Sequence, residues 1–374
     1  MMPVTLSLYL DLVRFAAAVV VVLAHCWIVL FPGYPLHWPG PPAVIVFFVL
    51  SGFVIAFVAD GRDRTLTDYA LNRLSRLWSV ALPALGFGLV LSCFVRHSPF
   101  SPFAPAGGAL PVSAANALFL GQVWFLDAPP LLNDPFWSLN YEAWFYAIFG
   151  ASAYLARPAR LPAVCVLAAL AGPKILLLMP CWLLGAWLYR NIGRWPLSDR
   201  AALGLWAVSL CAALLLVKSA VPMRLHDGFQ ASWPEAARLL AFSASPLTDY
   251  PLAMLVALNF YAAAHLGRVG RVLLPFARPI RALASCTLTT YLFHVPLLVL
   301  FWDVLRLPAG ACLAALAASI AVVASLTEHR RRELRALLSG LLGRARGFFS
   351  EAGRGDLPRA ERDKLPKEAG GIGR

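Results

Sequence analysis

Two ionisable side chains, Arg14 and His25, interrupt an otherwise apolar segment that runs from Tyr9 to Phe31. Their positions differ by eleven, which in an α-helix is about 1100° of rotation and about 16 Å along the axis. The spacing therefore predicts that both lie on one face of a helix. Ionisable groups inside membrane-spanning helices are costly, so they usually face a cavity or a partner and mark a functional path.

Each of these two residues also has a structural interpretation. Asp11 precedes Arg14 by three positions, a helical spacing at which the pair could form an ion pair that only orients the helix. His25 could be a histidine that is hydrogen-bonded to a neighbouring helix. Both interpretations stay open at this point, and the two roles of Arg14 are compatible.

The composition is typical of a membrane protein. Hydrophobic residues make up 60% of the 374 positions and charged residues 14%, against about 45–50% and about 25% in soluble proteins. The mean hydropathy is +0.70. We predict an all-α, polytopic integral membrane protein with about ten transmembrane helices, forming one membrane-embedded domain over residues 1–327.

The predicted spans are residues 9–30, 43–60, 77–95, 137–156, 161–172, 175–190, 201–217, 246–266, 284–302 and 308–327. Residues 114–126 could add a short re-entrant or interfacial helix. The arginines of the loops lie mostly on the side that holds the N-terminus, and this bias predicts that both termini are cytoplasmic.

The net charge of +13 is concentrated after the last predicted span, because residues 328–374 hold 12 of the 32 Lys and Arg residues. Such a segment suits anionic lipid headgroups and gives no indication of nucleic-acid binding. We predict that residues 328–374 form a basic, disordered cytoplasmic tail.

Further polar residues stand out against the apolar background. They are Ser51 in FFVLSGFVI, Arg73 and Arg76 in RLSRLW, Glu142 in FWSLNYEAWFY, and His294 in TYLFHVPL. We place the two arginines at the inner mouth of the third predicted span. Glu142 falls near the outer start of the fourth span, and His294 falls near the middle of the ninth.

In this order, the motifs resemble those of the family-3 membrane acyltransferases, bacterial enzymes that acylate cell-envelope sugars. The resemblance rests on YLDLVR followed by His25, on the four motifs above, and on their sequence over residues 8 to 326. It implies a multi-pass protein of the bacterial inner membrane. The implied reaction moves an acyl group, expected to be acetyl, from acyl-CoA to a hydroxyl of a polysaccharide, lipopolysaccharide or lipid-linked glycan.

The resemblance also implies roles for individual residues. The Arg14 and His25 pair would be essential, with His25 as the general base, since imidazole is suited to proton transfer near neutral pH. Arg14 would bind a phosphate or carbonyl of the donor, because guanidinium donates a planar fork of hydrogen bonds. Glu142 would hold the tautomer of His25 or bind the acceptor sugar, unless it only favours a helix start.

The other candidates are secondary. Arg73 and Arg76, with Ser51, would bind the acyl donor from the cytoplasm, although basic residues are common on inner loops. His294, Trp137 and Ser138 would line the cavity, although Trp137 could belong to an interfacial aromatic belt. The expected partners are acyl-CoA as co-substrate, a glycan acceptor and membrane lipids. No permanently bound cofactor is expected, and no metal motif or nucleotide loop is evident.

Two other functions remain possible from the sequence. A transporter or flippase could use Arg14, Glu142 and His294 to line a translocation path without covalent chemistry. A non-catalytic component of an envelope assembly complex would be indifferent to the loss of His25. If the chain is an acyltransferase, we expect the thioester arm of the donor to pass Arg14 and meet an outward-facing acceptor at His25.

Overall fold

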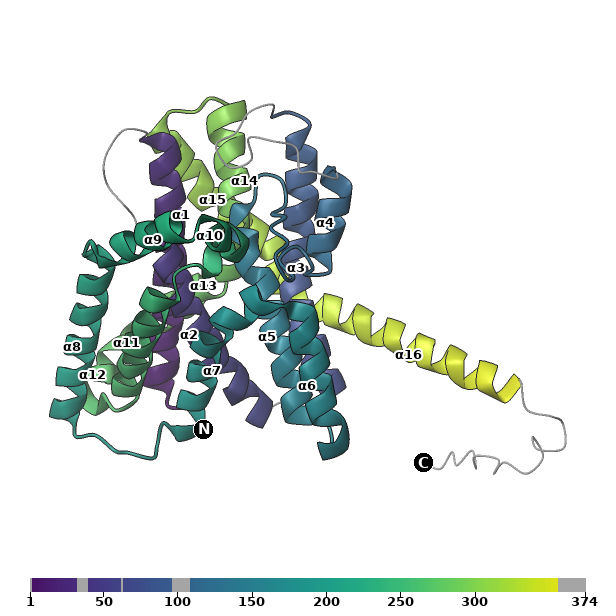
Figure 1. Ribbon diagram of the computed structural model, residues 1–374, viewed down its shortest axis with the longest axis horizontal. Coiled ribbons are helices and arrows are strands. Elements are labelled where there is room, and N and C mark those ends of the chain that lie inside the picture. Colours follow the sequence, from purple (N-terminus) through teal and green to yellow (C-terminus); the bar gives the residue numbers. More distant parts are fainter. Residues whose placement is uncertain (1, 32–39, 62, 96–107, 356–374) are drawn as a thin grey trace.

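The chain folds into a bundle of helices, and the computed structural model describes residues 2–31, 40–61, 63–95 and 108–355 (Figure 1). No strand occurs within these ranges. The first half holds α1 (Val4–Leu30), α2 (Gly40–Gly61), α3 (Leu66–Ser92), α4 (Ala109–Ala117), the 3-10 turn η1 (Asp134–Phe136), α5 (Trp137–Tyr154), α6 (Arg157–Ala171) and α7 (Pro173–Asn191).

The second half of the chain holds the remaining helices. In order they are α8 (Asp199–Lys218), α9 (Val221–Ser232), α10 (Pro234–Leu240), η2 (Ala241–Ser243), α11 (Pro246–Ala264), α12 (Gly267–Gly270), η3 (Arg271–Phe276), α13 (Ala277–Ala284), α14 (Thr287–Val299), the π-turn η4 (Leu300–Val304), α15 (Ala309–Leu326), η5 (Glu328–Arg330) and α16 (Arg331–Gly355). Short α9 and α10 were not expected from the sequence.

The predicted fold class is confirmed, and each of the ten predicted spans coincides with a helix. Within the described residues, seven helical segments are long and apolar enough to cross a membrane. They are Val4–Leu30, Gly40–Gly61, Leu66–Ser92, Asp199–Lys218, Pro234–Ala264, Thr287–Val304 and Ala309–Arg344. The helices α5, α6 and α7, which coincide with the fourth to sixth predicted spans, are not among these seven.

The third helix starts eleven residues before its predicted span, at Leu66. Thr65 caps it, because its side chain accepts a hydrogen bond from the backbone N–H of Asp68 at 3.1 Å, as expected of a threonine at a helix N-terminus. Arg73 and Arg76 therefore lie two to three turns inside the helix. The predicted span 77–95 places both ahead of it, whereas the helix itself includes them; their position at the inner mouth of the membrane span stays a prediction.

The short helix expected at 114–126 is only partly present. α4 ends at Ala117, and the following loop contains Phe119 and Trp124 with positive φ angles of 58° and 54°. The backbone N–H of Trp124 donates to the carbonyl of Ala171 at 2.9 Å. This hydrogen bond ties the loop to the break between α6 and α7 at Gly172.

Part of the tail that we expected to be disordered is helical. α16 places leucines at 334, 337, 338, 341 and 342, the spacing of one apolar face on a helix. Arg335 in its second turn donates to Asn72 of α3 at 2.6 Å and forms an ion pair with Asp68 at 3.2 Å. Helix-forming residues and this anchor explain why the segment is helical and not disordered. Figure 1 shows α16 leaving the side of the bundle, and residues 356–374 lie outside the described part.

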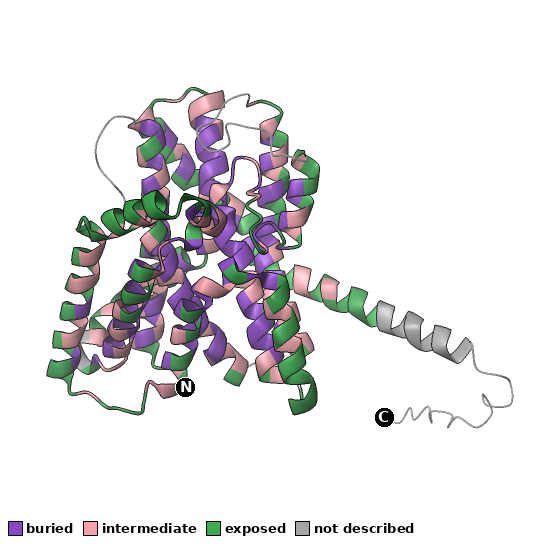
Figure 2. Cartoon of the chain, in the orientation of Figure 1, coloured by how far each residue is buried: buried purple, intermediate pink, exposed green. Residues whose placement is uncertain are grey.

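The buried residues concentrate in the middle of the bundle, where α2, α5, α7 and α14 meet (Figure 2). At the crossing of α2 and α7, the backbones touch at two glycines. A Cβ atom on Gly52 would overlap the carbonyl of Trp182, and a Cβ on Gly185 would overlap the carbonyl of Val49. Glycine is required at both positions because only it allows this close approach.

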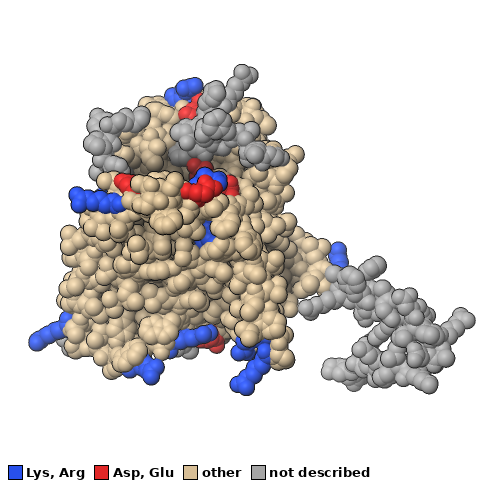
Figure 3. Space-filling model, in the orientation of Figure 1, with Lys and Arg blue, Asp and Glu red and all other residues tan. Residues whose placement is uncertain are grey.

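Charged side chains avoid the middle of the surface. On the face seen in Figure 3, they gather at the lower end, which holds the start of α1, and in the upper third, with a broad band between that has almost none. An uncharged band between two charged ends is what a bilayer requires. The predicted site residues thus lie inside a membrane-embedded bundle.

Candidate active site

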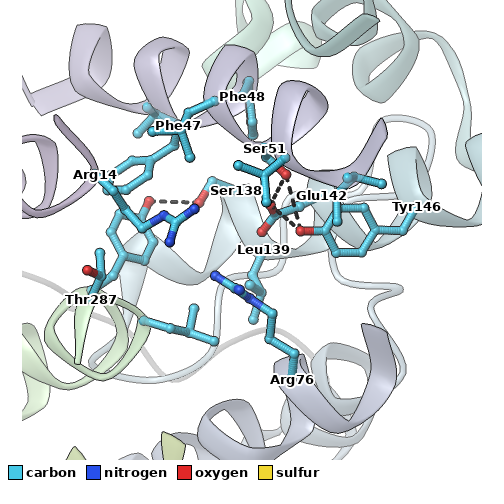
Figure 4. Close-up of a pocket in the computed structure, with 16 residues that line it drawn as sticks. Arg14, Phe47, Phe48, Ser51, Arg76, Ser138, Leu139, Glu142, Tyr146 and Thr287 are labelled. Carbon is cyan, nitrogen blue, oxygen red and sulfur yellow. Dashed lines mark hydrogen bonds between the residues drawn. The ribbon is translucent and has the colours of Figure 1, made fainter. Parts of the chain in front are cut away.

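Side chains from five helices surround a cavity of about 80 Å³ in the middle of the bundle (Figure 4). We call it the central cavity. Its polar lining residues are Arg14 of α1, Ser51 of α2, Arg76 of α3, Ser138, Glu142 and Tyr146 of α5, and Thr287 and Tyr291 of α14. Four residues that were singled out from separate sequence motifs, Arg14, Ser51, Arg76 and Glu142, therefore come together.

Glu142 is the centre of a hydrogen-bond network on one wall of this cavity. Its Oε1 accepts from the hydroxyl of Ser51 and from the hydroxyl of Tyr146, the latter at 2.5 Å. Trp182 of α7 donates its indole N–H to Ser51 Oγ at 3.1 Å. Because charge-assisted bonds of this kind are strong and directional, Ser51 and Glu142 are held in a fixed geometry.

Arg14 forms the ion pair considered for it and also lines the central cavity. Its Nη1 lies 3.4 Å from Asp11 Oδ1, so the i,i+3 ion pair exists, and its side chain is 15% exposed. In Figure 4 its guanidinium points into the central cavity, toward that of Arg76. The two guanidinium groups outnumber Glu142, the one carboxylate among the lining residues of this cavity, so the geometry favours an anionic or strongly polarised ligand.

Arg14 and Arg76 also line a second cavity of about 330 Å³ on the side of the bundle that holds the start of α1. We call it the basic vestibule. Its charged lining residues are Asp11, Arg14, Arg76, Arg281, Glu328, Arg331 and Arg332. The two arginines thus stand where the two cavities adjoin.

Arg73 is not part of either cavity. It forms an ion pair with Asp63 at 3.6 Å, and its guanidinium lies 5.7 Å from the centre of the Tyr69 ring. A step of three residues leaves two side chains only about 60° apart around a helix, so the partners separate the two guanidinium groups. Arg73 is held by Asp63 and Tyr69, whereas Arg76 faces the two cavities. The sequence carried a signal for this pairing in Asp63, which immediately precedes the capped start of α3.

His25 and His294 form a hydrogen-bonded pair, with 3.1 Å between His25 Nδ1 and His294 Nε2. The carbonyl of Thr290 accepts from His294 Nδ1 at 3.0 Å, and the carbonyl of Val21 accepts from His25 Nδ1 at 2.9 Å. Since a carbonyl can only accept, both neutral rings carry their proton on Nδ1. His294 Nε2 is then an acceptor for the Nδ1–H of His25, and the lone pair of His25 lies on Nε2.

This pair corrects one of the roles considered for Glu142. We considered Glu142 as the group that holds the tautomer of His25, but its carboxylate lies in the network with Ser51 and Tyr146. His294 of α14 is in that position instead. Sequence periodicity shows which residues share a face of one helix, but it does not show how two helices are rotated against each other.

Neither histidine lines the central cavity, and the remaining candidates differ from one another. Ser138 lines it and shares a 2.7 Å hydrogen bond with the hydroxyl of Tyr291. Trp137 does not, because its ring stacks on Phe242 with centroids 4.2 Å apart. Tyr291, which sequence reasoning missed, lies one helical turn before His294 and connects the cavity to the histidine pair, with ring centroids 6.3 Å apart.

The chain is similar to known acyltransferases. The family model described as "Acyltransferase domain" matches residues 7–327. The exopolysaccharide production protein ExoZ of Rhizobium meliloti (strain 1021) is 32% identical over 136 residues, which cover 33% of this chain and 38% of that protein. The acyltransferase MdmB of Streptomyces mycarofaciens is 33% identical over 113 residues, covering 29% of this chain and 27% of that protein.

These alignments span less than half the length of either relative, and no solved structure matches the chain. The family match, in contrast, takes in every helix from α1 to α15. The central cavity and the histidine pair lie wholly inside it. The chain therefore belongs to this acyltransferase family, and its fold is that of an all-α polytopic membrane protein.

Proposed function

We propose that the enzyme transfers an acyl group, expected to be acetyl, from acyl-CoA to a hydroxyl of a cell-envelope polysaccharide, lipopolysaccharide or lipid-linked glycan. The relative ExoZ is named for exopolysaccharide production, which supports a sugar-containing acceptor. Acyl-CoA would be a co-substrate that leaves after each turnover. The proposed location is the bacterial inner membrane with both termini in the cytoplasm.

One observation carries this proposal. The polar path through the bundle has arginines at one end and the histidine pair at the other, with the central cavity between them. The positions of Arg14 and His25 on α1 differ by eleven, or about 16 Å of helix. A long donor that enters among the arginines could reach the histidine pair with its thioester.

In this mechanism His25 Nε2 takes the proton of the acceptor hydroxyl as its oxygen attacks the thioester carbonyl. The resulting tetrahedral oxyanion collapses, the C–S bond breaks, and the thiolate of the donor leaves and takes up the proton from His25. The new bond is an ester on the sugar. His294 Nε2 accepts from His25 Nδ1–H throughout and so stabilises the imidazolium while it exists.

Arg14 and Arg76 would act on the donor before the reaction, since they lie where the two cavities adjoin. Guanidinium groups bind phosphate and carbonyl oxygens with charge-assisted bonds. Glu142 and Ser51 would form a rigid polar wall that the donor arm passes. The central cavity of about 80 Å³ holds several waters, at roughly 10–15 Å³ each, so it must widen to admit this arm.

The experiment that tests the function measures transfer of radiolabelled acetyl from acetyl-CoA into envelope glycans by membranes that contain the protein. Membranes with equal amounts of His25→Ala and of the control His226→Ala are compared. His226 is suitable because it lies on α9, bonded to Ser245 at 3.2 Å and outside both cavities. We expect label with wild type and His226→Ala, and none with His25→Ala. Equal label from all three would contradict the proposed base.

A further inference from the structure

The basic vestibule contains more positive charge than its own carboxylates can neutralise. Five arginines, from α1, α3, α13 and α16, line it together with two acidic residues, Asp11 and Glu328. Asp11 is paired with Arg14. Across the ranges that the structure describes, no carboxylate lies within ion-pair distance of Arg76, Arg281, Arg331 or Arg332.

The second carboxylate is already engaged elsewhere. Glu328 is 9% exposed, and its Oε2 accepts from the backbone N–H of Thr289 at 3.1 Å and from the Thr289 hydroxyl at 3.2 Å. It therefore caps the first turn of α14. Its position is fixed by that helix, and within the described residues it forms no ion pair with an arginine.

We propose that the basic vestibule binds phosphate groups, and that the bound groups are those of the nucleotide part of the acyl donor. Converging guanidinium groups in a partly enclosed space repel one another, and a doubly charged phosphate relieves that repulsion. Arginine is also the side chain whose hydrogen-bonding fork matches phosphate oxygens. The assignment to the donor rests on the proposed acyl transfer, whereas the phosphate chemistry stands without it.

Arg331 and Arg332 give the C-terminal segment a part in this site. They are the first residues of α16 and directly follow η5, which contains the cap residue Glu328. Arg335, one turn on, anchors the helix to Asn72 and Asp68 of α3. The anchor fixes the start of α16, so the two arginines are held at the vestibule.

The volume agrees with a ligand larger than one phosphate. The vestibule measures about 330 Å³, against about 80 Å³ for the central cavity. Arg14 and Arg76 line both, so a ligand whose phosphates sit in the vestibule can extend its uncharged part inward. The same chemistry would also fit the diphosphate of a lipid-linked substrate, and the test must separate the two sources.

The test is a binding measurement on the full-length protein in nanodiscs, by isothermal titration with coenzyme A. Arg331→Gln and Arg332→Gln are each expected to weaken the binding about tenfold, the usual effect of losing a charge-assisted bond. Arg330→Gln is the matched control, because Arg330 is the adjacent residue but pairs with Glu333 at 3.2 Å and does not line the vestibule. It should bind as wild type does.

Two additional ligands identify the source of the phosphates. Pantetheine, which has the thiol arm without the nucleotide, should bind weakly and equally to wild type and variants. Farnesyl diphosphate should not displace coenzyme A, and displacement would assign the vestibule to a lipid diphosphate instead. Arg281→Gln on α13 provides an independent variant, which should weaken coenzyme A binding even if substitutions on α16 disturb that helix.

Equal affinity of wild type, Arg281→Gln, Arg331→Gln and Arg332→Gln for coenzyme A would overturn the proposal. So would an equal loss in Arg330→Gln, because that would indicate a general charge effect. The measurement does not depend on turnover. If coenzyme A binds as described while no acetyl reaches any glycan, the proposed transfer fails and the phosphate site stands.

Discussion

The two ends of the polar path differ in how they use charge. At the basic vestibule, five arginines face a space of about 330 Å³ with two carboxylates among them. At the other end, His25 and His294 share a hydrogen bond, His294 is fully buried, and both rings are bonded to carbonyls of their own helices. An excess of fixed positive charge suits the binding of an anion, whereas a neutral pair suits the movement of a proton.

The difference predicts that binding and chemistry can be lost separately. Variants at the two ends test this separation, and variants outside both ends serve as comparisons.

Replacing His25 by Ala removes the proposed base and should lower kcat by about 10²–10⁴-fold, the usual contribution of general base catalysis. The affinity for coenzyme A should not change, because the vestibule is untouched. Turnover and calorimetric binding are measured on the same preparation. Loss of binding together with turnover would mean that the two ends are not independent.

Replacing His294 by Ala should lower kcat about 10–100-fold, since the imidazolium of His25 then loses a charge-assisted acceptor. The side-chain carbonyl of His294→Gln can still accept from His25 Nδ1–H, so this variant should recover part of the rate that His294→Ala loses. If His294 had only a structural role, the two variants would be equally slow. ¹⁵N spectra of labelled histidine report the tautomer directly. A His25 ring with its proton on Nε2 in the wild type would contradict the role assigned to His294.

Arg76→Gln and Arg73→Gln form a matched pair on one helix. Arg76 lines both cavities, so its loss should raise the KM for the acyl donor about tenfold. Arg73 pairs with the buried Asp63, so its loss should leave KM unchanged and lower thermal stability, because a buried carboxylate is left without its counter-charge. A rise of KM in both variants would show that Arg73 also acts on the donor.

A smaller effect is expected from Asp134, which lies on the η1 turn outside the spans and beside the histidine end. Burial, with a contribution from Asp127, raises its pKa from 3.8 to about 6. The neutral form therefore stabilises the fold. This stability is complete below about pH 3.8 and is lost as the pH rises through 6, by at most about 3 kcal/mol.

Asp134→Asn cannot ionise and should keep that stability. Its Tm should exceed that of wild type at pH 8 and equal it at pH 4, as measured by thermal unfolding in one detergent. The vestibule substitutions should show no such dependence between these two pH values, because arginine stays charged throughout. A pH-independent difference for Asp134→Asn would reject the raised pKa.

The sequence predicted the fold class and the four side chains that meet at the central cavity, because ionisable residues in apolar segments are few and each must find a partner. It did not predict that Arg73 turns away from Arg76, or that His294 and not Glu142 contacts His25. Those outcomes depend on how α3 and α14 are rotated within the bundle, which is decided by packing between helices. The segment that forms α16 was predicted to be disordered because of its high charge, although the spacing of its leucines is that of a helix.

The glycine contact between α2 and α7 limits how the path can open. Ser51 and Trp182 stand beside this contact, and the two backbones already touch at Gly52 and Gly185. That side of the central cavity is therefore rigid, because α2 and α7 could move apart only by giving up their closest packing. The widening that admits a donor arm must come from α1, α3 or α14 on the opposite side, so the helices that carry Arg14, Arg76 and His294 are also the ones expected to move during turnover.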